Sequence, residues 1–482
     1  DQAEKPPLYL LPLSARSEAA LRALARRTAD YLETTETPLA DIGYTAVQRR
    51  NHHNRRLVVM GRSRAELAEK LAQFAQGSPH DDVVEGTAVD QQQGIVFVFS
   101  GQGADLLGVG RELLVEEPIF RDVIEQCDAL LRQHADWSLL AELTAVAHLS
   151  RLEQNEVAQP VIFAIQAALA ALWQSWGIVP DAVIGHSLGE VSAAYVAGAL
   201  SLADAMRVVF HRGRVLAEAA GLGTMAAVGI SRAEAEALLS AEQDVSLAVV
   251  NSPDSLVLSG DWQALERIVA DLKAQDKFAR LLSAVNYPSH SRLMEPFGRR
   301  LETALSGLRS QAPQIPVFST SRGVWAADDD FDAAYWGRNI RRPVLFADGI
   351  ARMVADGYRT FVEISHHPML SVPLQQTGGD QIMVVESLRR NQPETAVLRR
   401  NLAALYTQGA AVDWSRFYPQ GRVADLPTYP WQRQRYWLDA PPRRRDGAGK
   451  AASHPLLGER LRAPLPTFEA AVSVPQFPFL GE

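Results

Sequence analysis

The feature that most constrains this chain is a glycine-serine-glycine pentapeptide between a predicted strand and a predicted helix. Apolar residues lead from Asp181 into Gly185-His186-Ser187-Leu188-Gly189, and residues 190–200 then have the small-residue composition of a packed helix. A serine on such a strained turn exposes its Oγ, and the flanking glycines permit close backbone approach. The helix start also offers unpaired amides to a developing oxyanion. The pattern predicts an α/β fold with Ser187 as a nucleophile.

A second glycine-bearing turn lies earlier in the chain. Residues 94–99 form a continuous apolar run, typical of a buried parallel strand, and Ser100-Gly101-Gln102-Gly103 follows it. Alone, such a turn is an ordinary strand exit. Beside Ser187 it can supply the second amide of an oxyanion hole, because acyl transfer needs two donors directed at one developing charge.

Arg212 lies 25 residues after Ser187, within a helix predicted over residues 202–219. Buried arginines are unusual unless they are paired. The spacing leaves two interpretations open. Arg212 grips a ligand carboxylate in a bidentate fork, or it forms a structural ion pair with Glu190 or another acid.

A nucleophilic serine needs a base, and the candidates among the eleven histidines are His290 and the pair His366-His367. His290 directly follows residues 224–283, whose β-α-β-β-α-β order predicts a ferredoxin-like subdomain inserted into the larger α/β body. The pair follows a predicted strand, where a simple strand-end turn is the ordinary interpretation. For His186, beside the serine, we expect a packing role.

Composition restricts the class of protein. A length of 482 residues favours two or three domains. The net charge of −8 argues against a nucleic-acid partner. The single cysteine, Cys127, excludes an intrachain disulfide and a cysteine-based zinc site, and it fits a reducing cytoplasm.

Asp1 to Pro7 has no signal-peptide character. The apolar stretch from Val161 to Trp173 is predicted to be a core helix with Pro160 in its first turn, too short and polar to span a membrane.

Five motifs in fixed order resemble the malonyl-CoA:acyl carrier protein acyltransferase family, in the form of an acyltransferase domain of a type I polyketide synthase. They are FSGQG at 99–103, AQP at 158–160, GHSLGE at 185–190, the arginine 25 positions after the serine, and YPSH at 287–290.

The resemblance implies four segments. Residues 1–93, predicted from periodicity to be a small α/β unit, would be the linker domain between a ketosynthase and the acyltransferase. Residues 94–395 would be the acyltransferase domain, an α/β-hydrolase-like core with a parallel sheet and the ferredoxin-like insertion. Residues 396–440 would be the linker after it. Residues 441–482 would be a flexible segment and, from HPLLG at 454–458, the start of a dehydratase-like domain.

The resemblance also implies roles for matching residues. Ser187 would carry the acyl group and His290 would be its base, without a triad acid and oriented by a main-chain carbonyl near residues 365–367. The amides of Gln102 and Leu188 would form the oxyanion hole, and Arg212 would bind the malonyl carboxylate. The remaining pocket and specificity residues would be Gln159, His186, Asn251, Tyr287 and Ser289. No metal ligand is implied.

The extender unit is less directly indicated. In the family, the tetrapeptide that ends in the catalytic histidine is typically HAFH in enzymes for malonyl and YASH in enzymes for methylmalonyl. This chain has Tyr287-Pro288-Ser289-His290 at these positions. Ser289 leaves space for an α-methyl group, while Leu188 and Ala158-Gln159 resemble malonyl enzymes. The motifs slightly favour malonyl.

The resemblance implies malonyl-CoA or methylmalonyl-CoA as substrate, no tightly bound cofactor, and a carrier protein whose phosphopantetheine accepts the acyl group. It further implies neighbouring ketosynthase and dehydratase domains, no nucleic-acid or membrane partner, and a cytoplasmic bacterial megasynthase of antibiotic biosynthesis. Arginine outnumbers lysine by 43 to 5, which is associated with GC-rich bacterial genomes.

Two other functions remain as alternatives. A serine esterase or thioesterase of the α/β-hydrolase type would use Asp330 and then His366 or His367. Arg212 argues against it, because hydrolysis of a neutral ester needs no buried cation beside the nucleophile. A docking module with a decayed site is the third interpretation, and the presence of Ser187, His290 and Arg212 together argues against it.

Overall fold

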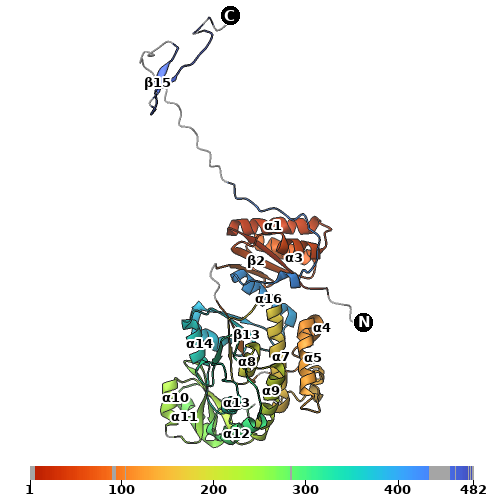
Figure 1. Cartoon of the computed structure of the whole chain (residues 1–482), viewed down its shortest axis with the longest axis vertical. Coiled ribbons are helices and arrows are strands. Elements are labelled where there is room, and N and C mark those ends of the chain that lie inside the picture. The colour runs from red at the N-terminus through yellow and green to blue at the C-terminus, as the bar shows by residue number, and fades with distance from the viewer. Residues whose placement is uncertain are drawn as a thin grey trace. The chain divides into compact units, whose positions relative to one another are not determined.

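The structure is a computed structural model, which describes residues 6–89, 94–103, 105–240, 242–282, 285–433, 456–461, 463–475, 477 and 479 (Figure 1). The chain divides into two compact units, residues 1–431 and 432–482. In the second unit, β15 (Glu459–Leu461) pairs antiparallel with β16 (Thr467–Glu469). The predicted flexible segment up to residue 453 and the first two residues of the HPLLG motif lie outside the described residues.

The first unit begins with a three-stranded antiparallel sheet of order β1-β2-β3. Alternating side chains divide its two faces: Leu11 and Val59 pack against α1 and α3, whereas Leu10 and Val58 belong to the large core cluster. Both faces are therefore buried. The elements are β1 (Tyr9–Ala15), α1 (Glu18–Thr34), α2 (Leu39–Gln48), β2 (Arg55–Gly61), α3 (Arg64–Ala75) and β3 (Val83–Thr87).

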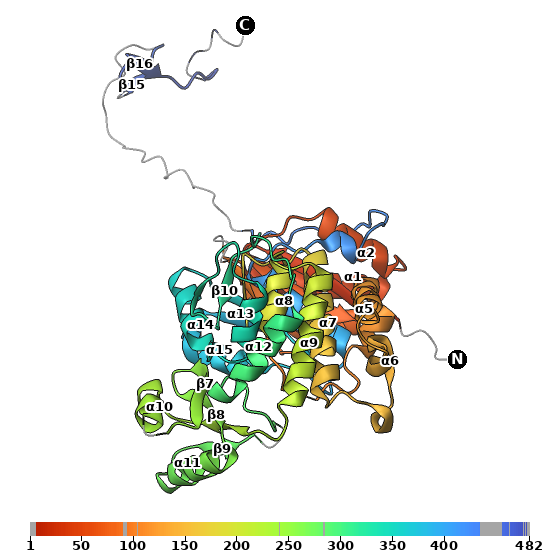
Figure 2. The same ribbon diagram turned by 60° about the horizontal axis from the view of Figure 1, so that its bottom comes forward.

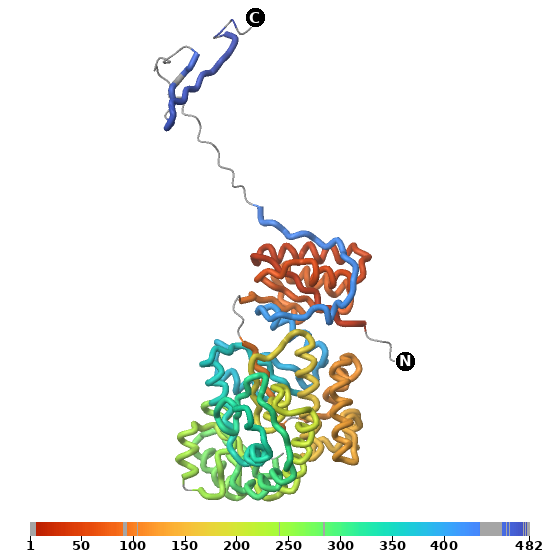
Figure 3. The backbone as a smooth tube through the Cα atoms, viewed as in Figure 1, coloured from red at the N-terminus to blue at the C-terminus, as the bar shows by residue number. Residues whose placement is uncertain are grey.

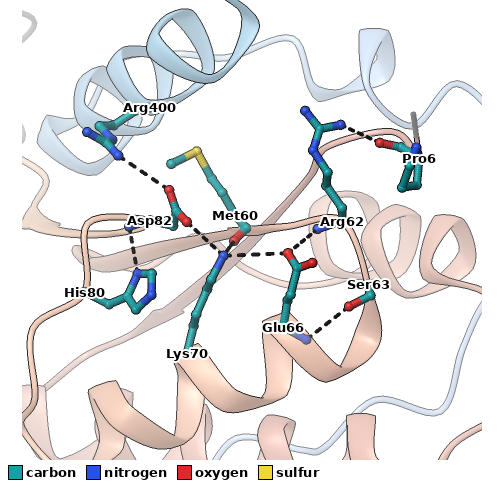
Figure 4. A network of polar contacts seen from close by, with 9 residues as sticks. All are labelled: Pro6, Met60, Arg62, Ser63, Glu66, Lys70, His80, Asp82 and Arg400. Carbon is teal, nitrogen blue, oxygen red and sulfur yellow. Dashed lines mark hydrogen bonds and ion pairs between the residues drawn. The ribbon is translucent and has the colours of Figure 1, made fainter. Parts of the chain in front are cut away.

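Helix α16 (Glu394–Gln408) lies against this sheet on the side opposite α1 and α3 (Figure 1). A polar network fastens it there (Figure 4). Asp82 accepts hydrogen bonds from Lys70 at 2.8 Å and from Arg400 of α16 at 3.5 Å. Lys70 also donates to the Met60 carbonyl at 2.9 Å. The contact between Asp82 and Arg400 joins residues 318 positions apart in the sequence.

The chain after α16 returns along the first sheet (Figure 3). The Tyr418 hydroxyl donates to the Leu10 carbonyl at 2.7 Å, and the Ala424 amide donates to Thr45 Oγ1 at 2.8 Å. The Arg16 amide also donates to the Tyr429 hydroxyl at 3.2 Å, so the chain follows the first sheet at least as far as Tyr429.

A six-stranded sheet of order β11-β10-β5-β4-β13-β14 forms the main body. All neighbouring strands pair in parallel, except that the edge strand β11 pairs antiparallel with β10. Because β4 and β5 are adjacent and parallel, the turns that follow them lie at the same edge of the sheet. The strands are β4 (Ile95–Phe99), β5 (Ala182–Gly185), β10 (Val317–Ser319), β11 (Val324–Trp325), β13 (Thr360–Ile364) and β14 (Met383–Glu386).

Helix α7 (Asn155–Ser175) is the central buried helix and packs beside α9 (Figure 2). It has 21 residues and begins five positions before Pro160, so the prediction that Pro160 lies in the first turn is wrong. Among the helices in the described ranges, it alone is long and apolar enough to cross a membrane, so the prediction that this stretch is too short and polar to do so is wrong. Of its most apolar 18 residues, 89% are buried inside the protein, as expected for a core helix.

The other helices of the main body flank the sheet (Figure 2). They are α4 (Arg111–Glu116), α5 (Pro118–Leu131), α6 (Leu139–Thr144), α8 (Gly189–Val196), α9 (Leu202–Glu218), α12 (Glu295–Ala304), α13 (Ala333–Asn339), α14 (Phe346–Ala355) and α15 (Ser371–Gly378).

The predicted ferredoxin-like subdomain is confirmed. Its sheet has the order β7-β8-β6-β9 with antiparallel neighbours, and β12 (Val344–Leu345) of the main body extends it parallel to β7. This added strand ties the insertion to the core. The elements are β6 (Thr224–Val228), α10 (Arg232–Leu239), β7 (Val245–Ser252), β8 (Ser255–Gly260), α11 (Trp262–Ala274) and β9 (Ala279–Leu281).

Candidate active site

Ser187 occupies the sharp turn between β5 and α8 with a φ of 54°. A non-glycine residue in the left-handed region is strained, as a nucleophile elbow requires. A Cβ at Gly185 would lie 2.2 Å from the Glu190 amide nitrogen, and one at Gly189 would lie 2.1 Å from the Phe99 carbonyl oxygen. Only glycine fits at either position, so both glycines are explained by the close approach of α8 to the sheet.

His290 contacts Ser187 directly, with 2.8 Å between Nε2 and the serine Oγ. Its other ring nitrogen, Nδ1, lies 2.8 Å from the Arg342 carbonyl, which can only accept. The proton is therefore assigned to Nδ1, and Nε2 keeps a lone pair directed at the serine hydroxyl. The expectation that a carbonyl near residues 365–367 orients the histidine is wrong: the chain just after α13 supplies it.

The backbone also fixes the position of His290. The residue has a φ of 62°, and its amide donates to the Ile340 carbonyl at 2.8 Å. Burial, followed by the nearby charge of Arg212, lowers the pKa of His290 to about 3 against the opposing effect of the Arg342 carbonyl. The imidazole is thus neutral at physiological pH and able to accept a proton.

Arg212 on α9 is buried, with 2% of its surface exposed. It donates from Nη2 to Ser187 Oγ at 3.0 Å and from Nη1 to Gln159 Oε1 at 2.9 Å. Burial lowers the pKa of Arg212 to about 10, so it remains a cation at neutral pH. It forms no ion pair with any acidic side chain in the described part of the chain, and the predicted alternative of an ion pair with Glu190 is contradicted.

The turn after β4 packs on the serine turn. A Cβ at Gly101 would lie 3.1 Å from the His186 carbonyl oxygen and 3.7 Å from Ser187 Cβ. Among the described residues, neither the Gln102 amide nor the Leu188 amide donates a hydrogen bond to a protein group. Gln102 and Leu188, whose amides are predicted to bind an oxyanion, line the same cavity as Ser187.

A cavity of about 230 Å³ joins these groups between the main sheet and the ferredoxin-like subdomain. Val249, Val257 and Leu282 give it an apolar wall from the subdomain side. All the other residues predicted for the pocket line it: Gln159, His186, Asn251, Tyr287 and Ser289. The Nε2 of His186 lies 3.0 Å from Asn251 Oδ1, and burial lowers the pKa of His186 to about 4, which fits the packing role expected for it.

Sequence reasoning missed two groups and misjudged a third. Asn339, at the end of α13, accepts from Arg212 Nε at 3.3 Å, and no motif marks it. The Arg342 carbonyl has no sequence signal, because any residue presents a carbonyl. Glu190 lies inside the GHSLGE motif but was considered only as a partner of Arg212, whereas it bonds Asn339 instead.

The arrangement predicted for a serine hydrolase is not formed. Asp330 pairs with Arg322. His367 Nδ1 accepts a hydrogen bond from the Arg390 amide at 3.4 Å, and the serine Oγ bonds His290 instead. Within the ranges that the structure describes, the site has a Ser-His pair and a buried cation, with a carbonyl in the place of a triad acid.

The sequence matches the family described as acyl transferase domain over residues 96–412. Residues 9–71 match a second family, described as CurL-like, PKS C-terminal. Among curated proteins, the spectinabilin polyketide synthase system protein NorA' of Streptomyces orinoci is 40% identical over 466 residues, which are 94% of this chain and 13% of that protein. Polyketide synthase GfsB of Streptomyces halstedii is 39% identical, over 92% of this chain and 8% of its own length. The chain thus spans a small part of these relatives.

Solved structures of acyltransferase domains have a similar fold. The acyltransferase domain from module 8 of the salinomycin polyketide synthase has a TM-score of 0.80 at 34% identity, covering 85% of this chain and 97% of that one. The acyl transferase domain of ZmaA has a TM-score of 0.81 at 27% identity, covering 89% and 100%. The predicted fold, an α/β-hydrolase-like core with a ferredoxin-like subdomain, is confirmed.

Proposed function

Because the chain belongs to the acyl transferase domain family of type I polyketide synthases, we propose that it moves a malonyl-type extender unit from CoA to the phosphopantetheine arm of a carrier protein. The observation that carries this proposal is the position of Arg212, whose Nη2 lies 3.0 Å from the Ser187 Oγ. A buried cation so close to a nucleophile selects an acyl group that bears its own carboxylate.

The first half-reaction forms an ester on Ser187. His290 Nε2 takes the hydroxyl proton as Oγ attacks the thioester carbonyl, and the amides of Gln102 and Leu188 stabilise the tetrahedral oxyanion. The carbon–sulfur bond then breaks, and the thiolate of CoA leaves with the proton held by His290. The guanidinium of Arg212 holds the malonyl carboxylate throughout.

The second half-reaction reverses these steps with another thiol. His290 takes the proton of the phosphopantetheine thiol, whose sulfur attacks the ester carbonyl. The carbon–oxygen bond breaks and the proton returns to Ser187, so no proton or electron is gained or lost over the cycle. These steps need no tightly bound cofactor. The two substrates are CoA and carrier-protein thioesters, and they react in turn at one serine.

For the extender unit we favour malonyl, with methylmalonyl tolerated. Leu188, which resembles malonyl enzymes, lines the cavity, and so do Ser289 and the apolar Val249, Val257 and Leu282. A single methyl group changes binding by only about 1–3 kcal/mol. The acyl transferase domain of SpnD, 30% identical to this chain, was solved in complex with a 2-(pent-4-yn-1-yl)malonyl group, so a relative with this fold accommodates a larger substituent.

We also propose that the chain is part of a cytoplasmic megasynthase. The match of residues 9–71 to a polyketide synthase family supports an N-terminal linker domain over residues 1–93. The segment from 396 to 440 would be the following linker, and residues 441–482 would lead into a dehydratase-like domain. The partners would be a carrier protein and the neighbouring ketosynthase and dehydratase domains.

Intact mass after short incubation tests the activity. Malonyl-CoA should add one malonyl group to the chain, methylmalonyl-CoA should label it more slowly, and acetyl-CoA should label it least, because only the first two offer a carboxylate to Arg212. The Ser187→Ala variant should show no adduct, and a phosphopantetheinylated carrier protein should remove the adduct from the wild type. Equal labelling by all three, or an adduct that water removes at once, would refute the proposal.

The pH dependence of malonyl transfer follows from the pKa of His290. The base works when its imidazole is neutral, and this form is fully present above its folded-state pKa of about 3. The value of kcat/KM for malonyl-CoA, which reports the free enzyme, should therefore change less than about twofold from about pH 8 to about pH 5.5. An acid limb centred near about pH 6.5, the ordinary value for histidine, would contradict this prediction.

A further inference from the structure

Glu190 is a buried carboxylate to which the mechanism above assigns no part. It is 1% exposed and lies in the first turn of α8, three residues after the nucleophile. Four residues donate hydrogen bonds to it: Thr320, Ser321, Tyr335 and Asn339. Burial raises the pKa of Glu190, and these donors act against that effect. The donors surround both carboxylate oxygens, and hydrogen bonds of this kind favour the ionised form.

Asn339 connects this carboxylate with Arg212. Its Nδ2 donates to Glu190 Oε2 at 2.6 Å, and its Oδ1 accepts from Arg212 Nε at 3.3 Å. A carboxylate can only accept, so Glu190 fixes which end of the amide faces it. The oxygen of Asn339 must then face the guanidinium. The same Nδ2 also approaches the Ser187 carbonyl at 3.4 Å.

The Asn339 side chain bonds only Nε of the Arg212 guanidinium and leaves the two terminal nitrogens to other partners. Arginine has five N–H donors, of which Nε bonds Asn339, one from Nη1 bonds Gln159 and one from Nη2 bonds Ser187. One N–H remains on each terminal nitrogen, so a carboxylate can still accept a hydrogen bond from both. A carboxylate in direct contact with Arg212 would compete for those donors.

We propose that Glu190 and Asn339 are positioning residues for the substrate carboxylate. Glu190 balances the buried charge of Arg212 across one amide, and Asn339 orients the guanidinium, so that the site is charge-compensated yet still open to a carboxyacyl group. This inference rests on the function proposed above. It accounts for a buried arginine that has no acidic contact partner among the described residues, an arrangement that would otherwise be costly.

Competition between two thioesters tests the inference. The full chain is incubated with equimolar malonyl-CoA and acetyl-CoA, and the ratio of malonyl to acetyl on Ser187 is read by mass, with KM and kcat for each. Glu190→Gln and Asn339→Ala are compared with Glu142→Gln. This control neutralises another buried carboxylate, which lies on α6, pairs with Arg151 and does not line the cavity. Melting temperatures identify variants that fold.

Both site variants should lower the malonyl-to-acetyl ratio about tenfold or more, the range for one charge-assisted hydrogen bond, mainly through a higher KM for malonyl-CoA. Glu142→Gln should keep the wild-type ratio. A folded Asn339→Ala variant with an unchanged ratio, or an equal loss with both thioesters, would overturn the inference, and this variant decides the question if Glu190→Gln does not fold. A wild type without preference for malonyl would instead refute the proposed function.

Discussion

His290→Ala is expected to lower the rate constant for acylation of Ser187 by malonyl-CoA about 10²–10⁴-fold, the usual contribution of a general base. The reason is geometric. His290 Nε2, at 2.8 Å, is the acceptor for the serine proton, whereas the other side chain at the Oγ, Arg212, can only donate. Stopped reactions analysed by intact mass give the rate constant directly. The affinity for malonyl-CoA should change little, since the ring nitrogens of His290 bond Ser187 and the Arg342 carbonyl and not Arg212, the residue that we assign as the carboxylate clamp.

His367→Ala is the matched control. This residue belongs to the pair that the hydrolase alternative would use as base, and its Nδ1 accepts from the Arg390 amide, not from the serine. Its acylation rate should equal that of the wild type. If His367→Ala loses the activity and His290→Ala keeps it, the base has been assigned to the wrong histidine.

The elements nearest the site could be predicted from the sequence because their signals are local. The apolar run at 94–99 appears as β4, and the strand-turn-helix around Ser187 appears as β5 and α8. The order of strands and helices in the inserted subdomain could also be predicted, because each segment has the apolar periodicity of its own type. A nucleophile turn can be recognised in a sequence because its glycines cannot be replaced by any residue with a Cβ.

The groups that orient the catalytic pair could not be predicted in the same way. The Arg342 carbonyl acts on His290 through a contact 52 positions away in sequence, and main-chain oxygens carry no residue-specific signal. Asn339 reaches Arg212 across 127 positions, on a short helix with no motif. The sequence predicts too late a start for α7, because proline is typical of a first helical turn, whereas Pro160 lies inside this helix.

Arg212→Ala is expected to reverse the acyl preference of the enzyme. The variant loses both N–H groups that we assign to the malonyl carboxylate, and a charge-assisted pair of this kind contributes about 2–5 kcal/mol when the partner is left buried. This corresponds to a loss of about 30-fold to about 5,000-fold in kcat/KM for malonyl-CoA. Acetyl-CoA makes no such contact, so its kcat/KM should hold or rise. Competition between the two thioesters, read as the mass of the acyl-enzyme, measures the reversal in one sample.

Arg207→Ala separates this effect from the general loss of an arginine on α9. Arg207 lies on the same helix five positions earlier, and its Nη2 donates to the carbonyls of Ala304 and Ser306 at 2.9 Å, away from the cavity. It should lower stability without changing the malonyl-to-acetyl ratio. The carboxylate clamp predicts that only the buried arginine sets acyl preference. A reversal in both variants would assign the preference to the packing of α9, whereas a reversal in neither would remove Arg212 from substrate recognition and leave its contact with Ser187 as its one catalytic role.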